Sequence, residues 1–263
     1  MARPQIYFIN LAHRVDRRRL LEDQLAALGL SAERIEAITP ADLPPRETRL
    51  FARPANPLGL TPREMACSFS HFETWRRLVA SEGDYALVLE DDVVLSRGLP
   101  DFLAASPIPG VVKLDAPRTS LRLGPPLATT GAVEIRTLLG RAGCTSAYLI
   151  DRPTAIWLLK HTDRLLRRPI DLALFNPYSA LGRGLKLRHA SPALATTLDR
   201  IPGPREPVAG GDILDRKTQA QKTLREVVHE LWVAIADEAA SRPHHIRQHL
   251  IGIKQHEIPF LPD

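Results

Sequence analysis

Three consecutive carboxylates, Glu90-Asp91-Asp92, are the side chains of this chain best suited to chemistry. They follow directly on the apolar run Tyr85–Leu89, which has the composition of a strand buried on both faces. Carboxylates crowded in this way repel one another, and a divalent cation would offset the repulsion. Oxygen ligands suit Mn²⁺ or Mg²⁺, which bind the phosphates of nucleotides. The triplet therefore predicts a metal and diphosphate site, with a solvated acidic turn as the structural alternative.

The position of the triplet supports this prediction. In open α/β sheets, ligands bind outside the carboxyl ends of the strands, where the triplet would lie. Strand alternation would put Glu90 and Asp92 on one side and Asp91 on the other, unless the chain bends there. A phosphoacceptor receiver domain also has an acidic cluster after its first strand, but it needs a later strand that ends in a lone aspartate. Asp115 comes too early for that role, so a receiver domain is excluded.

A second group of polar residues is expected on one helix. Thr61-Pro62-Arg63-Glu64 has the pattern of a capped helix start, with threonine as N-cap, proline at the first position and glutamate closing a capping box. At about 100° per residue, four side chains of this helix fall in a narrow wedge beside its apolar stripe. These four are Glu64, Ser68, His71 and Trp75. A wedge of this kind is suited to line a pocket.

The elements that must position these residues alternate between strand and helix. Residues 5–11 have the pattern of a strand, 16–28 of a helix ended by Gly29, and 34–38 of a second strand, which favours a parallel sheet with crossover helices. The other expected elements, in chain order, are a proline-rich loop over 43–57, a strand at 110–114, an antiparallel excursion over 121–139 with turns at Gly124-Pro125-Pro126 and Thr130-Gly131, a strand at 144–150, a helix at 153–166, a strand at 185–189, a linker over 201–211, and an amphipathic helix with Leu224, Val227, Val228, Leu231 and Ile235.

Composition limits the function classes. The 263 residues suffice for one α/β domain with an appendage. The net charge of +5 would suit binding of a nucleotide diphosphate or of an anionic membrane, or it reflects an arginine-rich composition overall. No basic run is interleaved with aromatic residues, so no nucleic-acid partner is expected. The run Ile6–Leu11 is too short for a signal peptide, and no apolar stretch approaches about 20 residues. Cys67 and Cys144 provide no disulfide framework and are expected to be packed thiols, so we expect a cytoplasmic protein.

Several short motifs of this chain form one pattern in order and spacing. They are Ile9-Asn10-Leu11 with Arg14 and Asp16-Arg17-Arg18; Leu60–Glu64; Cys67–His71 with Trp75-Arg76; Ala86–Asp92; Val112-Lys113-Leu114; Gly143–Ile150; and Pro169-Ile170-Asp171. Each motif alone is weak evidence, but together they cover about residues 5–175 and resemble glycosyltransferase family 25, the lipooligosaccharide-biosynthesis group that also includes collagen galactosyltransferase domains. The pattern is lost after about Pro192, in the region that should shape the choice of acceptor.

The resemblance implies a GT-A-like, Rossmann-type mixed sheet flanked by helices. It also implies a UDP-sugar donor, commonly UDP-galactose, an inverting mechanism and usually Mn²⁺. Carried over by position, the residues near the nucleotide and its diphosphate would be Asn10, Arg14, Arg17, Glu90 and Asp91.

Further assignments concern the metal and the chemistry. Glu90 and Asp92 would hold the metal, and His189, at the end of a predicted strand, would complete its coordination, as a late histidine often does in GT-A enzymes. An inverting transfer needs a carboxylate that removes the proton of the attacking hydroxyl, and Asp171 is the candidate base, with an N-cap role as the alternative. His71 would contact the donor or stabilise the leaving phosphate, or else form a buried hydrogen bond.

These assignments predict a catalytic domain over residues 1–200 and a linker with a helical extension over 201–263. The predicted function is transfer of a hexose from a UDP-sugar to a glycan or lipid-linked saccharide acceptor. Two alternatives stay open: a non-catalytic relative that keeps the fold for binding or adhesion, and a nucleotide-sugar hydrolase. The C-terminal helix, with Trp232 and basic residues after it, would pack on the domain or rest on the inner face of a membrane.

Overall fold

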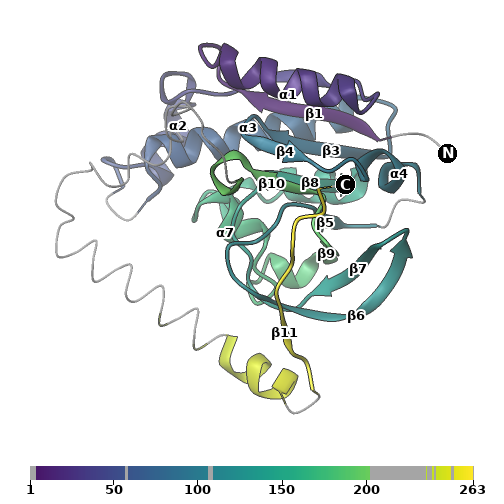
Figure 1. The fold of residues 1–263 in the computed structure, drawn as a ribbon. Helices are drawn as coiled ribbons and strands as arrows, with labels where there is room; N and C mark the ends of the chain where they lie inside the picture. The colour runs from purple at the N-terminus through teal and green to yellow at the C-terminus, as the bar shows by residue number, and fades with distance from the viewer. Residues whose placement is uncertain are drawn as a thin grey trace.

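The computed structural model describes residues 4–56, 59–105, 109–201, 235, 239, 241–249 and 252–262, and a nine-stranded mixed sheet forms its centre (Figure 1). The strands are ordered β11-β6-β7-β9-β5-β8-β3-β1-β2. Their bounds are β1 Gln5–Asn10, β2 Glu33–Glu36, β3 Tyr85–Glu90, β5 Val111–Lys113, β6 Leu121–Thr130, β7 Val133–Leu138, β8 Ala147–Asp151, β9 Leu187–Ser191 and β11 Gln255–His256. A second sheet pairs β4 (Val93–Leu95) with β10 (Ala195–Thr197).

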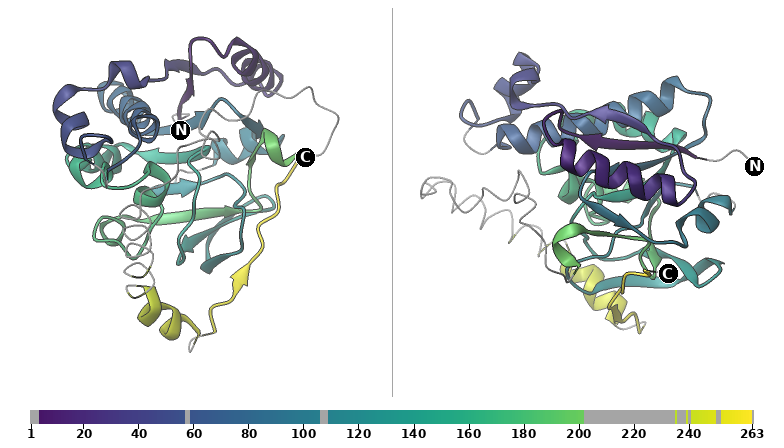
Figure 2. Two further views of the ribbon diagram at one scale, coloured as in Figure 1. Left: turned by 90° about the vertical axis from the view of Figure 1, so that its left-hand side faces the viewer. Right: turned by 45° about the horizontal axis from the view of Figure 1, so that its top comes forward.

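Helices cover both faces of the large sheet (Figure 2). Their bounds are α1 Val15–Ala27, α2 Pro45–Phe51, α3 Pro62–Ala80, α4 Leu99–Ala104, α5 Arg152–Leu159, α6 Thr162–Leu165 and α7 Ile170–Leu174. One hydrophobic core lies between the sheet and α3, α5 and α7, and the other lies beneath α1 and α4. Within the described part of the chain, no helix is long and apolar enough to cross a bilayer.

The first half of the sheet is parallel, as the sequence predicts. β1 pairs in parallel with β2 on one side and with β3 on the other. Alternating residues of β1 enter the two cores, with Tyr7 in the first and Phe8 in the second. The crossover helix α1 is followed by Gly29 at a φ of +65°, the left-handed conformation in which glycine ends helices. Because β1 and β3 are parallel, their carboxyl ends meet at the edge of the sheet where the acidic triplet begins.

Helix α3 begins as the sequence predicts. Thr61 is its N-cap, and the capping box with Glu64 is present in both directions. The wedge of four polar residues divides in the structure: Glu64 and His71 line a pocket, whereas Ser68 and Trp75 are fully buried. The predicted pocket wall is therefore confirmed for two of the four.

Several secondary-structure predictions were wrong in detail. The proline-rich stretch over 43–57 contains α2, which starts at Pro45, because proline is tolerated in the first turn of a helix. The predicted turn at Gly124-Pro125-Pro126 lies within β6, where register shifts against β7 accommodate the prolines. The single helix over 153–166 is divided into α5 and α6.

The end of the chain returns to the domain, as Figure 2 shows for the yellow segment. Residues 241–249 are helical, β11 pairs antiparallel with β6, and Ile258 is buried in the first core. Residues 252–262 are thus part of the same sheet and core as the residues before 201. The predicted linker beyond Ile201 and the helix predicted from Leu224, Val227, Val228, Leu231 and Trp232 lie outside the described residues, and Ile235 is exposed.

Candidate active site

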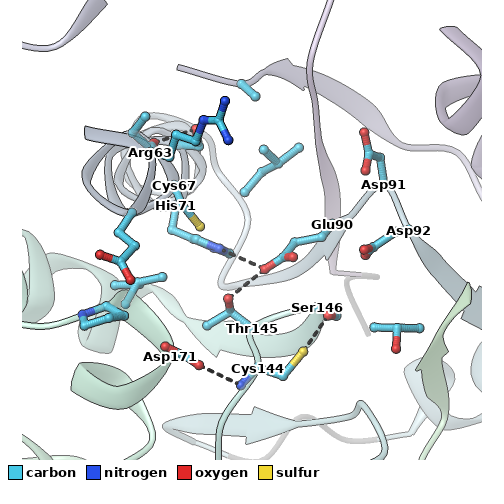
Figure 3. A pocket seen from close by; sticks show the side chains of 18 of the residues that line it. Arg63, Cys67, His71, Glu90, Asp91, Asp92, Cys144, Thr145, Ser146 and Asp171 are labelled. Atoms are coloured by element: carbon cyan, nitrogen blue, oxygen red, sulfur yellow. Dashed lines mark hydrogen bonds and ion pairs between the residues drawn. The ribbon is translucent and has the colours of Figure 1, made fainter. Parts of the chain in front are cut away.

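A pocket of about 1130 Å³ opens at the carboxyl end of β3 (Figure 3). Its walls come from the first turn of α1, the N-terminal half of α3, the loop before β8, the start of α7 and the turn after β10. Most small-molecule sites occupy roughly 300–1,000 Å³, so this pocket has room for a large ligand or for two smaller ones. The sequence-predicted residues that line it are Arg17, Glu64, His71, Glu90, Asp91, Asp92 and Asp171.

The three carboxylates of the triplet point in different directions. β3 ends at Glu90, and the next two residues lie in a turn. Glu90 faces α3, and its Oε1 accepts a hydrogen bond from the Thr145 hydroxyl at 2.7 Å. Asp91 and Asp92 both face Arg17 instead, with Asp91 Oδ1 at 3.1 Å and Asp92 Oδ2 at 3.8 Å from its Nη1. The chain therefore bends after Glu90, and the strand alternation that would pair Glu90 with Asp92 does not hold.

Asp91 links β3 to the segment that follows β1. Its Oδ2 accepts a hydrogen bond from Asn10 Nδ2 at 2.7 Å, and its Oδ1 accepts one from Arg17 Nη1 at 3.1 Å. Asn10 is 1% exposed; it also donates to the Arg14 carbonyl at 3.0 Å and accepts from Arg34 Nε at 3.0 Å. Burial raises the pKa of Asp91 despite these donors. Because both of its oxygens bind protein groups, Asp91 holds β1, α1 and β3 together.

Of Asn10, Arg14 and Arg17, which were predicted to lie near the nucleotide, only Arg17 lines the pocket. Arg14 is buried and binds the Asp16 carboxylate with Nε at 3.1 Å and Nη2 at 2.9 Å. The Asn10 amide already binds the Asp91 carboxylate, the Arg14 carbonyl and the Arg34 side chain. Arg17 is 8% exposed, and its Nε is buried without a hydrogen-bond partner. Arg17 is therefore the cation best placed to meet an anionic ligand in the pocket.

Asp92 has the least satisfied carboxylate of the triplet. Its Oδ1 is buried and has no hydrogen-bond partner. Burial and the charge of Glu90 raise the pKa of Asp92 to about 7. A cation close to this carboxylate would favour its ionised form and relieve the repulsion from Glu90. Asp92 is therefore the member of the triplet that fits a divalent metal best.

His71 ends a buried chain of hydrogen bonds. Trp75 Nε1 donates to the Tyr148 hydroxyl at 2.9 Å, and this hydroxyl lies 3.0 Å from His71 Nδ1. The indole can only donate, so the Tyr148 hydroxyl either donates its proton to His71 Nδ1, which leaves Nε2 protonated, or accepts a second hydrogen bond from Nδ1, which leaves Nε2 unprotonated. Nε2 lies 3.4 Å from Glu90 Oε1. The chain of contacts thus orients the imidazole toward Glu90 at the floor of the pocket.

Glu90 and Asp92 differ in acidity because their surroundings differ. Burial by itself would raise the pKa of Glu90, but its contacts with His71 and Thr145 hold that pKa below its ordinary value. The pKa of Asp92 is raised instead. Two neighbouring carboxyl groups whose pKa values are pushed apart are typical of sites that divide acid and base roles between them.

A tight loop before β8 forms another wall of the pocket. Cys144 has a φ of +71°, which is why the strand predicted over 144–150 starts only at Ala147. The fully buried Lys113 holds this turn: its Nζ donates to the Cys144 carbonyl at 2.6 Å and to the two Asp115 oxygens at 2.6 and 2.7 Å. The geometry of the wall therefore depends on a buried ion pair beneath it.

Asp171 lies across the pocket from Asp92 (Figure 3). Its Oδ2 accepts a hydrogen bond from the Cys144 amide at 3.1 Å, and its Oδ1 accepts one from the Leu172 amide at 2.8 Å. The alternative that Asp171 is an N-cap was wrong, because Pro169 occupies the N-cap position of α7. Each oxygen keeps a lone pair, so Asp171 can still accept a hydrogen bond from a ligand.

The structure does not bring His189 to the pocket. It is fully buried in β9, its Nδ1 lies 2.6 Å from the Ala190 carbonyl, and it pairs in register with Lys113. Burial, reinforced by the charge of Lys113, lowers the pKa of His189 to about 3. Its place among the metal ligands Glu90 and Asp92 is therefore corrected: His189 belongs to the interior of the sheet.

Sequence reasoning missed a cluster beside the triplet. Cys67, which was expected to be a packed thiol, lines the pocket one helical turn before His71. The ligand atoms of Cys67, His71 and Glu90 all lie within 4.8 Å of one another. A spacing of four residues on a helix places two side chains on one face, so the sequence held a signal for this pair. The sequence held no such signal for Thr145, because this residue contacts Glu90 from a loop 55 residues away.

Comparisons with known proteins agree with the N-terminal motifs. Residues 3–107 match glycosyltransferase family 25 (LPS biosynthesis protein). The "Glycosyltransferase 25 family member" proteins of Aedes aegypti and Anopheles gambiae are each 32% identical over 96 residues, which are 34% of this chain and 16% of each relative. The match thus spans only about a sixth of these relatives. The lacto-N-neotetraose biosynthesis glycosyltransferase LgtE of Neisseria gonorrhoeae is 26% identical over 212 residues, 73% of each protein.

Two solved structures resemble the fold more distantly. A glycosyltransferase involved in glycosylation of the major capsid of PBCV-1 has a TM-score of 0.38 and 10% identity, over 76% of this chain and 95% of that one. Mannose-1-phosphate geranyltransferase from Thermus thermophilus has a TM-score of 0.39 and 16% identity, over 72% and 73%. The mixed sheet flanked by helices, with its acidic triplet at the carboxyl end of β3, confirms the mixed α/β fold that the motifs implied. The N-terminal part of the chain, residues 3–107, is therefore similar to glycosyltransferase family 25.

Proposed function

We propose that this chain is a metal-dependent, inverting glycosyltransferase. It transfers a hexose from a UDP-sugar to a saccharide or lipid-linked saccharide acceptor, and galactose is the first candidate for that hexose. The observation that carries the proposal is the juxtaposition of Arg17 and Asp92 in one pocket at the carboxyl end of β3. The first is a buried cation suited to a diphosphate, and the second is an unsatisfied carboxylate suited to a metal. The name of the gonococcal relative, which refers to lacto-N-neotetraose biosynthesis, supports a saccharide product.

Mn²⁺, or Mg²⁺ in its place, would be held by Asp92 with Glu90 beside it. The orphaned Asp92 Oδ1 and the raised pKa of this carboxyl group fit a cation at this position. Oxygen ligands match the preference of both ions. When bound, such an ion neutralises negative charge on a departing diphosphate. Glu90 faces His71, so Asp92 is the primary ligand in this proposal.

The donor nucleotide would lie along the side of the pocket formed by the ends of β1 and β2. Arg17 would bind the diphosphate through charge-assisted hydrogen bonds, helped by its unpartnered Nε. An apolar wall with a threonine at its end is suited to a flat base and its ribose. The residues of this wall are Ile9, Leu11, Ala37, Ile38, Thr39 and Pro40.

The acceptor would enter on the side of Asp171. An attacking hydroxyl must give up its proton to a base within hydrogen-bond reach, and Asp171 lines the pocket with acceptor capacity to spare. His71, oriented by Tyr148, would present Nε2–H to the donor sugar or its leaving phosphate from the floor of the pocket. The base and the leaving group would then be served from different walls, as a displacement with inversion requires.

The test is a turnover screen across UDP-sugars with saccharide acceptors, with and without Mn²⁺. Asp92→Asn should lower Mn²⁺-dependent turnover by about 100-fold or more, on the scale of removing a main electrostatic contact to the transition state. The matched control is Asp84→Asn, the same change at an exposed position before the start of β3, which should leave turnover unchanged. Full activity of Asp92→Asn would overturn the proposal, and donor hydrolysis without transfer to any acceptor would favour the hydrolase alternative.

Cytoplasmic location and contact with the inner face of a membrane stay predictions. The helix that would make this contact, with Trp232, lies outside the described residues. Vesicle co-sedimentation of the full chain, with and without anionic lipid, tests the membrane contact directly.

A further inference from the structure

Helix α3 and the end of β3 bring a thiol, an imidazole and a carboxylate together. Cys67 and His71 are one helical turn apart on the same face of α3, and Glu90 faces them across the pocket floor (Figure 3). Their ligand atoms lie within 4.8 Å of one another. In the described part of the chain, no other group of three or more His, Cys, Asp and Glu side chains meets this criterion. The three carboxylates of the triplet therefore do not share one site, and Glu90 lies instead with the Cys67 and His71 side chains of α3.

The imidazole of His71 points into this cluster with an unused nitrogen. His71 is fully buried, and its Nε2 has no hydrogen-bond partner. Glu90 Oε1 is 3.4 Å away and forms no hydrogen bond with it. A buried polar nitrogen without a partner is costly, and a cation between His71 and Glu90 would give Nε2 a partner.

The groups around the cluster resemble the outer shell of a metal site. Histidine ligands usually have their second nitrogen held by a neighbouring group, and His71 Nδ1 lies 3.0 Å from the Tyr148 hydroxyl. Ligating carboxylates are in turn hydrogen-bonded, and Glu90 Oε1 accepts from Thr145. The Tyr148 oxygen can accept from both Trp75 and His71, which frees His71 Nε2 to bind a metal in its other tautomer.

We propose that Cys67 Sγ, His71 Nε2 and Glu90 form a site for a thiophilic divalent cation, with Zn²⁺ as the best fit. Sulfur, nitrogen and carboxylate oxygen are the ligands of tetrahedral Zn²⁺, and three protein ligands leave a fourth position open to the pocket. The site differs in kind from Asp92, where oxygen ligands favour Mn²⁺ or Mg²⁺. Thiolate and carboxylate together balance the charge of the ion, and binding releases the thiol proton.

Occupancy of this site would remove Glu90 and His71 from the donor. We therefore expect Zn²⁺ to inhibit transfer that Mn²⁺ supports, a consequence that rests on the proposed glycosyltransferase function. The Zn²⁺ site itself does not depend on that function, and its binding test requires no turnover.

The binding test uses Co²⁺ as a spectroscopic substitute for Zn²⁺. Titration of the metal-free full chain should give a thiolate-to-cobalt charge-transfer band that saturates at one equivalent and disappears when Zn²⁺ is added. The chain has two cysteines, which supplies a matched pair of variants. Cys67→Ser should abolish the band, and Cys144→Ser should keep it. Absence of the band in the wild-type chain, or its survival in Cys67→Ser, would overturn the proposal.

A second measurement separates this site from the transferase proposal. If the chain transfers sugar, the Zn²⁺ concentration that halves Mn²⁺-supported turnover should rise about tenfold or more in Cys67→Ser, relative to the activity of that variant without Zn²⁺. Melting temperatures check that each variant folds, and Cys67→Ala replaces Cys67→Ser if serine destabilises α3. A cobalt band without any transferase activity would contradict the proposed function while confirming the metal site. Equal Zn²⁺ inhibition of the wild-type chain and Cys67→Ser would contradict the inhibitory role.

Discussion

The two sides of the acidic triplet differ in how their charges are satisfied. On the α1 side, both oxygens of Asp91 accept hydrogen bonds, from Asn10 and Arg17, within a buried network. On the α3 side, Glu90 faces His71, whose buried Nε2 has no hydrogen-bond partner. The Asp91 carboxylate is satisfied without a ligand, and the His71 imidazole is not. Consecutive residues of the same charge can therefore divide into one that stabilises the fold and others that are left available for a ligand.

The largest effect on stability is expected at Lys113, which holds the loop that carries Thr145 on the α3 side of the triplet. Lys113→Met should lower the free energy of unfolding by about 3–5 kcal/mol, because it leaves the buried Asp115 carboxylate without its partner. Urea denaturation measures the loss. Lys186→Met, the same change at an exposed position, should alter stability by less than about 0.5 kcal/mol. Equal effects of the two substitutions would show that the loop has another anchor.

The next effect compares two neighbours in the triplet. Asp91→Ala should cost about 3 kcal/mol in the free energy of unfolding, because it removes the acceptor of two buried hydrogen bonds, one from Asn10 Nδ2 and one from the charged Arg17 Nη1. Asp92→Ala removes a carboxylate whose Oδ1 has no hydrogen-bond partner, and it should change stability by no more than about 1 kcal/mol. Urea denaturation of both variants decides the matter. A larger loss in Asp92→Ala would reverse the structural and functional assignments.

The smallest effect is a pH dependence. The pKa of Asp92 is raised from 3.8 to about 7 by burial and by Glu90, so the folded protein keeps a proton that the unfolded chain has released between these values. The stability contributed by this group is full below about pH 4, falls as the pH rises to about 7, and is constant above it. With EDTA present, the melting temperature of Asp92→Asn relative to wild type should therefore rise across this window, at ~3 °C for each kcal/mol of stability that the wild type loses. A difference independent of pH would show that Asp92 is ionised throughout.

Local signals made the first half of the fold predictable. Gly29 after α1, the capping box at Thr61 and the apolar run before Glu90 each act within a few residues, and each predicted its element. The C-terminal return was not predictable, because the two residues of β11 carry no pattern, and their pairing with β6 depends on a partner far away in the sequence. Proline in β6 was misinterpreted because only the neighbouring strand shows that the register shifts there.

The site was predictable in position but not in its division of roles. The triplet was located correctly because a buried strand leads directly into it. The role of Asp91 depends on Asn10, 81 residues earlier, and the orientation of Glu90 depends on Thr145, 55 residues later. His189 was assigned to the metal because it ends a strand, yet that strand places it inside the sheet. Strand ends can be predicted from sequence, whereas partners brought by other strands and loops cannot.

Calorimetric titration of UDP into the full chain tests the central claim, that Asp92 and Arg17 form a metal-dependent diphosphate site, most directly. Binding of UDP should require Mn²⁺, should be lost or at least about tenfold weaker in Asp92→Asn, and should be unchanged in Asp84→Asn, whose carboxylate is exposed before the start of β3. UDP binding of equal affinity with and without Mn²⁺, or undiminished binding in Asp92→Asn, would contradict it.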